Sequence, residues 1–141
     1  MASQLETSST PILRHGPYAS VSLAFLALAS ADIIIKVAGF SRLYRTVKHW
    51  PISKNGTNDR EMIASICASV DKATMYYPKH ALCLQRSAVA TCLLRRQGVA
   101  AEMVIGCRKI PFHSHAWVEV DGEVVNDKKK VPQFYKILAR F

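Results

Sequence analysis

Three residues far apart in the sequence, Cys83, His115 and Asp127, have side chains that together can perform acyl transfer. A cysteine thiolate is a nucleophile, a histidine can take and return its proton, and a carboxylate can orient the imidazole. Cys83 falls at the expected start of a helix, where unpaired N–H groups and the positive helix end stabilise a thiolate. The same N–H groups can receive an oxyanion. The pattern therefore predicts a Cys-His-Asp site that attacks an amide or an ester.

The run that contains His115 alternates between two kinds of side chain and predicts a strand with two different faces. One face is expected to line a cleft and the other to pack on the core. The cleft face carries His113, His115, Trp117 and Glu119, and the core face carries Ala116, Val118 and Val120. A histidine beside a tryptophan on the cleft face suits a catalytic base.

The turn after this strand decides whether His115 can meet Asp127. A two-residue turn at Asp121-Gly122 places these two side chains on opposite faces of the hairpin. A three-residue loop that ends at the same glycine pairs Glu119 with Glu123 and sets the aspartate opposite the histidine. We predict the three-residue loop, because it satisfies both the apolar pattern and the contact between histidine and aspartate.

The helices that must position these residues follow from apolar spacing and turn residues. Apolar density predicts a buried helix over 20–38 that stops near Gly39, and then a second, basic helix that ends before Pro51. After a turn, Asp59 is the expected N-cap of a third helix, which Pro78 interrupts.

A fourth helix over 82–97 carries Cys83 near its start and closes at Gly98. Three short runs typical of strands follow, over 99–107, 115–120 and 123–127. The last residues, 132–141, fit a strand or a short helix equally well. Helices first and strands afterwards predict an α+β fold, in which the helix of the nucleophile packs on a small antiparallel sheet.

Length and composition indicate one compact domain overall. The 141 residues are 50% hydrophobic, which excludes a disordered chain and allows a buried core. Within it we expect a flexible arm over 1–17, a helical segment over 18–56 and a catalytic core over 57–141. The 19 Lys and Arg residues outnumber the 10 Asp and Glu residues, and this excess favours acidic partners.

The cysteines and the N-terminal apolar run bear on the cellular compartment. The cysteines form no CxxC pair and are Cys67, Cys83, Cys92 and Cys107. We expect them to be reduced, with the last two in the core. The uncharged run over 16–31 ends like a signal-peptidase site but is too short for an ordinary membrane span. Because the apolar pattern continues past Asp32, we predict a buried helix, no membrane span and a cytoplasmic protein.

The segment over 80–127 resembles the core of the lasso-peptide leader peptidases, a family of transglutaminase-like cysteine proteases. The shared motifs are a Cys-Leu-x-Arg-Ser helix start, an Arg-Arg-x-Gly helix end, a Val-Ile-Gly strand, a His-Ala-Trp-Val-Glu strand and a final Asn-Asp. In this chain they stand at 83–87, 95–98, 104–106, 115–119 and 126–127. The resemblance is clear over about 60–130 and weaker over 20–50.

The resemblance implies a transglutaminase-like or papain-like core with Cys83 as nucleophile, His115 as base and Asp127 as the orienting carboxylate. It implies removal of the leader from a ribosomally made lasso-peptide precursor, with the leader presented by a separate small leader-binding protein. An asparagine-synthetase-like cyclase then closes the ring. Arg86 and Trp117 are candidate supports of the thiolate or substrate, and Arg86 fits a structural salt bridge equally well. No cofactor, metal ion or nucleic acid is expected.

Three other interpretations fit the sequence. A transglutaminase-like triad can transfer an acyl group on a different substrate. His113 and His115, with Cys83 or Cys107, form a possible zinc site, although a second close pair of ligands is missing. The basic second helix could bind RNA or an anionic membrane in a non-catalytic module. Activity that survives Cys83→Ala would favour this last interpretation.

Overall fold

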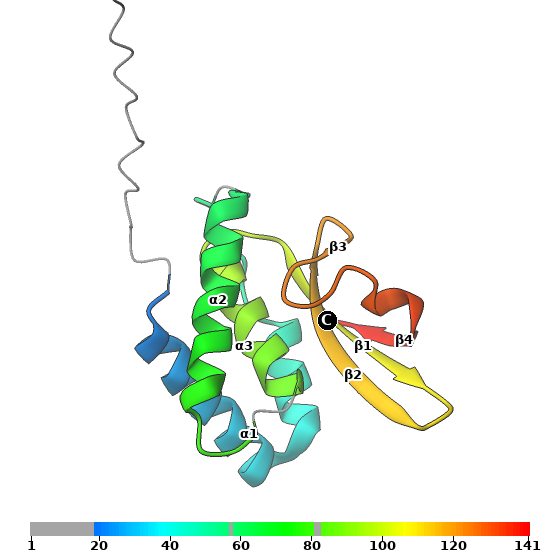
Figure 1. Cartoon of the computed structure of the whole chain (residues 1–141). Coiled ribbons are helices and arrows are strands. Elements are labelled where there is room, and N and C mark those ends of the chain that lie inside the picture. Colours follow the sequence, from blue (N-terminus) through cyan, green and yellow to red (C-terminus); the bar gives the residue numbers. More distant parts are fainter. Residues whose placement is uncertain (1–18, 57, 81–82) are drawn as a thin grey trace, which may run out of the picture.

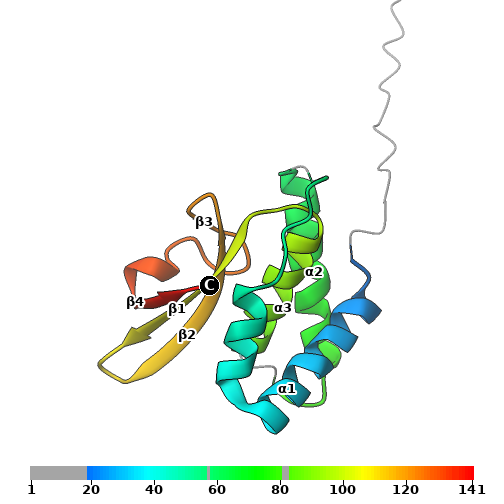
Figure 2. The ribbon, with the colours of Figure 1, turned by 180° about the vertical axis from the view of Figure 1, so that it is seen from behind.

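The computed structural model describes residues 19–56, 58–80 and 83–141 of the chain. In this part of the chain, helices α1, α2 and α3 form one layer and an antiparallel sheet forms the other (Figures 1 and 2). The α+β prediction is confirmed, and α3 lies between the other helices and the sheet. The expected arm over 1–17 lies outside the described residues.

Helix α1 (Val21–Lys48) consists of two arms that meet at a bend (Figure 1, blue and cyan). Gly39 interrupts it with φ 77° and ψ 173°, so the predicted stop is a change of direction within one element. By length and composition alone α1 could cross a membrane. In the structure α1 packs on α2 and α3, but only 17% of its most apolar stretch is buried, so the prediction of a buried helix is wrong for most of this segment. The buried residues that make this contact are Ala24, Leu28, Ala31, Leu43 and Val47.

Helices α2 (Arg60–Tyr76) and α3 (Cys83–Arg96) begin and end close to the predicted residues. Asp59 caps α2, because its side chain accepts a backbone N–H from the first turn at 3.0 Å. Gly98 follows α3 with φ 85°, a conformation that glycine adopts without strain. A Cβ on Gly98 would lie 2.2 Å from the Cα of Gly56, so the two glycines let the preceding loop touch the end of α3.

The sheet has the strand order β3-β2-β1-β4, and each neighbouring pair is antiparallel. Its strands are β1 (Ala101–Arg108), β2 (His113–Val120), β3 (Glu123–Val124) and β4 (Lys136–Arg140). The C-terminal segment, which the sequence left open, is therefore an edge strand beside β1. A short 3₁₀ helix over Val131–Gln133 precedes it.

The hairpin between β2 and β3 has a two-residue turn, so the prediction of a three-residue loop is wrong. Val120 pairs with Glu123, where the prediction paired Glu119 with that residue. Asp121 has φ 51° and Gly122 has φ 78°. Two consecutive positive φ angles define a type I′ turn, whose twist matches that of the strands. The preference of Asp121-Gly122 for this turn outweighs the argument on which the longer loop was predicted, that His115 and Asp127 must stand directly opposite each other on paired strands.

The second face of the sheet, predicted to line a cleft, is largely covered. A small core lies on it, made of Val104, Trp117, Val124 and Val131. Glu119 is buried on the same side, where its carboxylate accepts hydrogen bonds from Trp117 Nε1 at 2.8 Å and Arg140 Nη1 at 2.7 Å. Only the first half of β2, which includes His113 and His115, is open to solvent. The predicted cleft is thus confined to that half.

Arg95 joins the helices, the sheet and the C-terminal residue from inside the core. It is 7% exposed, and its guanidinium donates to the carbonyls of Ala101 at 2.8 Å, of Phe141 at 3.0 Å and of Val47. Because it donates hydrogen bonds to carbonyls of α1, of β1 and of the last residue, it stabilises the packing of these parts of the chain.

Candidate active site

Cys83 is the first residue of α3 and is half-buried beside β2. Its thiol forms hydrogen bonds with the imidazole of His115 and with the backbone of Ala116 and Leu84. Burial by itself raises the pKa of this thiol, but the hydrogen bonds and the nearby imidazole outweigh it, and the pKa is lowered. The backbone N–H groups of the first helical turn have no intrahelical partners and face the same region.

The imidazole of His115 connects Cys83 to Asp127. His115 Nε2 lies 2.7 Å from Asp127 Oδ2, which leaves Nδ1 for the thiol. The hydrogen bond with Cys83 raises the pKa of His115, burial opposes this, and the contact with Asp127 raises it further. Burial acts to raise the pKa of Asp127, but hydrogen bonds from the N–H of Lys128 and from His115 lower it. The arrangement favours a thiolate–imidazolium pair beside an ionised aspartate.

The side chain of Asn126 fixes the loop that places Asp127 beside His115, beyond the end of β3. Its Oδ1 accepts the N–H of Val118 at 2.7 Å and takes the place of a strand carbonyl. Its Nδ2 donates to Ser87 Oγ at 3.1 Å, and that hydroxyl donates to a backbone carbonyl of β2 at 3.0 Å. This buried network joins α3, β2 and the loop of the aspartate. It explains how the two side chains meet in a register that was expected to separate them.

Arg86 holds the same loop from the side of α3. Its Nη2 donates to the carbonyl of Asn126 and lies 3.9 Å from Asp127 Oδ2. Its Nε lies 3.4 Å from Asp71 Oδ1, an ion pair without hydrogen-bond geometry. These contacts match the salt-bridge interpretation of Arg86. The guanidinium lies beside the aspartate and stabilises its charge.

An aromatic cluster supports the imidazole of His115. The ring centroids of Trp117 and Tyr135 lie 6.2 Å and 5.4 Å from that of His115, and the Tyr135 hydroxyl lies 3.1 Å from His113 Nδ1. A Cβ on Gly106 would lie 2.8 Å from the Cβ of Tyr135 and 2.9 Å from the Trp117 ring, so only glycine leaves room for both. Trp117 is fully buried. It supports the site and is not placed to contact substrate, which corrects half of its predicted role.

The sequence missed the positioning roles of Ser87, Asn126 and Tyr135. Asn126 directly precedes Asp127, and this position was the one feature of the sequence that could have suggested its role. Its hydrogen-bond partners, however, are 8 and 39 residues away in the sequence, and only the folded chain brings them together.

The other cysteines lie in different surroundings. Burial raises the pKa of Cys67 and of Cys92 to about 11. All four cysteines are free, and Cys92 and Cys107 are partly buried, not fully in the core as expected. Among the described residues, no group of three or more His, Cys, Asp or Glu side chains is placed to hold a metal ion. The alternative zinc site therefore has no assembled set of ligands.

Replacing Asn126 with alanine is expected to weaken both the fold and the reaction. It leaves the buried N–H of Val118 without an acceptor, which costs about 1–3 kcal/mol of unfolding free energy. It also frees the loop that positions Asp127. Urea unfolding measures the first effect, and rates at a temperature where the variant is fully folded measure the second. An unchanged rate in the folded variant would contradict the positioning role, and the exposed Asn55→Ala is the matched control.

The fold and the site place the chain in a known class. A family model described as the transglutaminase-like superfamily matches residues 26–139, so the chain belongs to this superfamily. A curated relative, "Microcin J25-processing protein McjB" from Escherichia coli, is 39% identical over 57 residues, which are 40% of this chain. The match spans 27% of the length of that relative. No solved structure matches the chain.

Proposed function

We propose that this chain is the cysteine peptidase that removes the leader from a ribosomally made lasso-peptide precursor. The observation that carries the proposal is the unbroken contact from the thiol of Cys83 through His115 to the carboxylate of Asp127. Membership of the transglutaminase-like superfamily and the partial match to a microcin-processing protein support it. The motifs shared with the leader peptidases coincide with the residues that build this contact.

In the proposed reaction, the proton of the Cys83 thiol moves to His115 Nδ1 and the thiolate attacks the last carbonyl of the leader. The negative charge that develops on the carbonyl oxygen is stabilised by free N–H groups at the start of α3. The C–N bond then breaks, and His115 returns the proton to the departing amine of the core peptide. His115 then deprotonates a water molecule, which attacks the thioester carbonyl; the C–S bond breaks, the leader leaves as a free acid, and His115 returns the proton to the Cys83 sulfur. Asp127 orients the imidazole and stabilises its positive charge.

The proposal also includes partners and a place of action. We expect a separate small leader-binding protein to present the precursor, and an asparagine-synthetase-like cyclase to use the exposed α-amine. The formal net charge of +9 suits an acidic leader or partner. Four free cysteines suit a reducing compartment, which supports action in the cytoplasm.

A reconstituted cleavage assay tests the function. The reduced chain is mixed with the precursor, the leader-binding protein and a small primary amine. The products are then identified by mass spectrometry. We expect the free leader acid and a core peptide with a new N-terminus. A precursor that stays intact would refute the proposal. A leader that carries the amine in place of a free acid would instead assign acyl transfer.

The pH dependence of cleavage should report the thiolate–imidazolium pair. Because the pKa of Cys83 is lowered, the acid limb of kcat/KM is expected below the ordinary cysteine value of about 8.5. Because the pKa of His115 is raised, the alkaline limb is expected above the ordinary histidine value of about 6.5.

Asp127→Asn removes a contact that raises the pKa of His115. Its alkaline limb should therefore move to lower pH, and its maximal rate should fall on the order of 10³-fold. Rate profiles of wild type and variant at matched ionic strength provide the comparison. An alkaline limb at the same pH in both proteins would show that Asp127 does not act on His115.

A further inference from the structure

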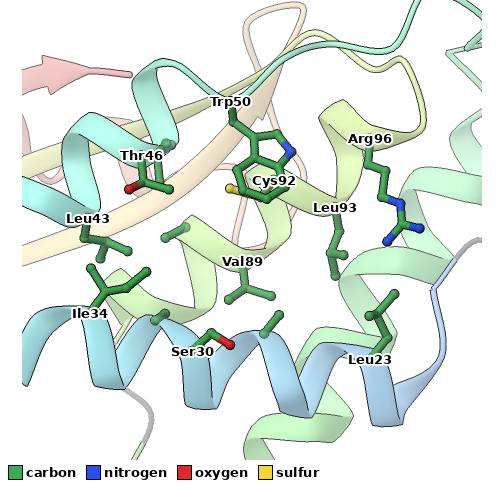
Figure 3. Close-up of a pocket in the computed structure, with 14 residues that line it drawn as sticks. Leu23, Ser30, Ile34, Leu43, Thr46, Trp50, Val89, Cys92, Leu93 and Arg96 are labelled. Carbon is green, nitrogen blue, oxygen red and sulfur yellow. The ribbon is translucent and has the colours of Figure 1, made fainter.

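An apolar groove lies on the helical layer and contains none of the triad residues (Figure 3). It lies between the two arms of α1 and the side of α3, with Leu43, Thr46 and Val47 of the second arm in its lining, and Trp50, just beyond the end of α1, stands above it. The cavity volume is about 230 Å³. Figure 3 shows Leu23, Ser30 and Ile34 on one side and Val89 and Arg96 on the other. The proposed reaction uses none of these side chains.

The spacing of the lining residues suits a third helix. On α1, Leu23, Ala27, Ser30 and Ile34 recur every three or four residues and so share one helix face. On α3, Val89 and Arg96 are two turns apart. Two neighbouring helix faces form a trough that side chains of another helix can fill. From Leu23 to Ile34 the trough is about 16 Å long, or roughly three helical turns.

The apolar surface continues from the groove along α1. Leu26, Ile33 and Val37 are 64%, 59% and 82% exposed, and their spacing of seven and four residues places them on one stripe. A row of large apolar side chains exposed on one helix face suits an interaction site. A partner that fills the groove could cover this stripe as well.

The positive charge of the groove and of the chain favours an acidic partner. Arg96 is the one charged residue among those that line it, and the exposed Arg42, Arg45 and Lys48 lie on other faces of the second arm of α1, outside the groove. With a net charge of +9, two copies of the chain repel each other. A concave trough between helices also suits a helix better than a flat lipid surface. We propose that this groove docks an acidic amphipathic helix of a partner protein.

Docking there is compatible with turnover at the candidate active site. The groove uses α3 from Ala88 onward, whereas Cys83 lies at the first residue of the same helix. A bound helix would therefore leave the thiol accessible. The docking proposal does not depend on the identity of the nucleophile, and it can be tested on binding alone.

Trp50 provides a direct readout of the groove. The chain has two tryptophans, of which Trp50 is 39% exposed and Trp117 is fully buried. The probe is a synthetic helical peptide of about 18 residues, with leucines on one face and glutamates beside them. Its matched control carries lysine at every glutamate. With the full chain, the acidic peptide should shift the Trp50 emission to the blue and bind at least about tenfold more tightly than its control.

A charge reversal completes the test. Arg96 is exposed, so Arg96→Glu should keep the fold, weaken the acidic peptide about tenfold or more, and strengthen the lysine peptide. Trp50→Phe should abolish the emission shift but not the binding that labelled peptide reports. Equal binding of both peptides, or no binding of the acidic one, would overturn the proposal. A shift caused only by phosphatidylcholine vesicles containing phosphatidylglycerol would overturn it too, and would assign a membrane surface.

Discussion

Replacing Cys83 with alanine is expected to abolish leader removal, with a loss of about 10⁴-fold or more in rate. The variant keeps His115 and Asp127 in contact but has no nucleophile to form the thioester. Because Cys83 is only half-buried at a helix start, the fold should survive the change. Single-turnover cleavage, measured with circular dichroism of the same samples, provides the comparison.

His115→Ala should have an effect of similar size, since the thiol then loses both its base and the hydrogen bond that lowers its pKa. Cys107→Ala is the matched control, because Cys107 lies at the end of β1 and has no part in the triad. Its rate should stay within about twofold of wild type. A wild-type rate in either triad variant would remove the replaced residue from the reaction and contradict the proposed triad.

Replacing Arg95 with methionine should be the most damaging single change to the fold. The substitution removes three charge-assisted hydrogen bonds, to the carbonyls of Ala101, Val47 and Phe141, although the last two carbonyls keep a backbone N–H donor. A hydrogen bond from a charged group contributes about 1.5–3 kcal/mol, so we expect the loss of three to lower the unfolding free energy by about 3 kcal/mol or more. For a domain of this size that corresponds to a Tm lower by roughly 10 °C.

Arg96→Met gives the control for this prediction, since Arg96 is the neighbouring arginine on α3 and is exposed. It should change the unfolding free energy by less than about 0.5 kcal/mol. Thermal and urea unfolding of both variants give the comparison. Equal stabilities for the two variants would show that the three carbonyls do not need Arg95.

The ends of the helices could be predicted because their signals are local. Asp59 caps α2 through its own side chain, and Gly98 follows α3 in a left-handed conformation. Gly39 was recognised as a break, but the continuation of the helix after a bend depends on the packing of α1 against α2 and α3. Signals that lie within one turn of a residue can be read from the sequence, whereas packing directions cannot.

The hairpin shows where two correct arguments conflict. Asp121-Gly122 is a strong signal for a two-residue turn, and the contact between His115 and Asp127 argued for the other register. The structure has both the two-residue turn and the contact. The prediction of the longer loop assumed that backbone pairing of the two strands continues to Asp127. In the structure the side chain of Asn126 makes hydrogen bonds in place of that pairing. A strand end of this kind has no pattern in the sequence.

The candidate triad could be chosen from residue types and a helix start, whereas its supports could not. The ring of Tyr135 and the space at Gly106 become relevant only once β4 and its preceding turn lie beside β1. The structural role of Arg95 could not be predicted for the same reason, since its carbonyl partners lie as far as 48 residues away in the sequence. These contacts are long-range and depend on the packed sheet.

The most direct test of the central claim is the pH dependence of cysteine alkylation. The reduced chain is treated with limiting iodoacetamide between about pH 5 and pH 9, and modified residues are mapped by mass spectrometry. An unperturbed thiol with a pKa of about 8.5 is almost fully protonated near pH 6. We expect Cys83 to react rapidly at that pH and to lose this reactivity in His115→Ala, while Cys67 and Cys92 react slowly. Slow labelling of all four cysteines at that pH would contradict an activated nucleophile at Cys83.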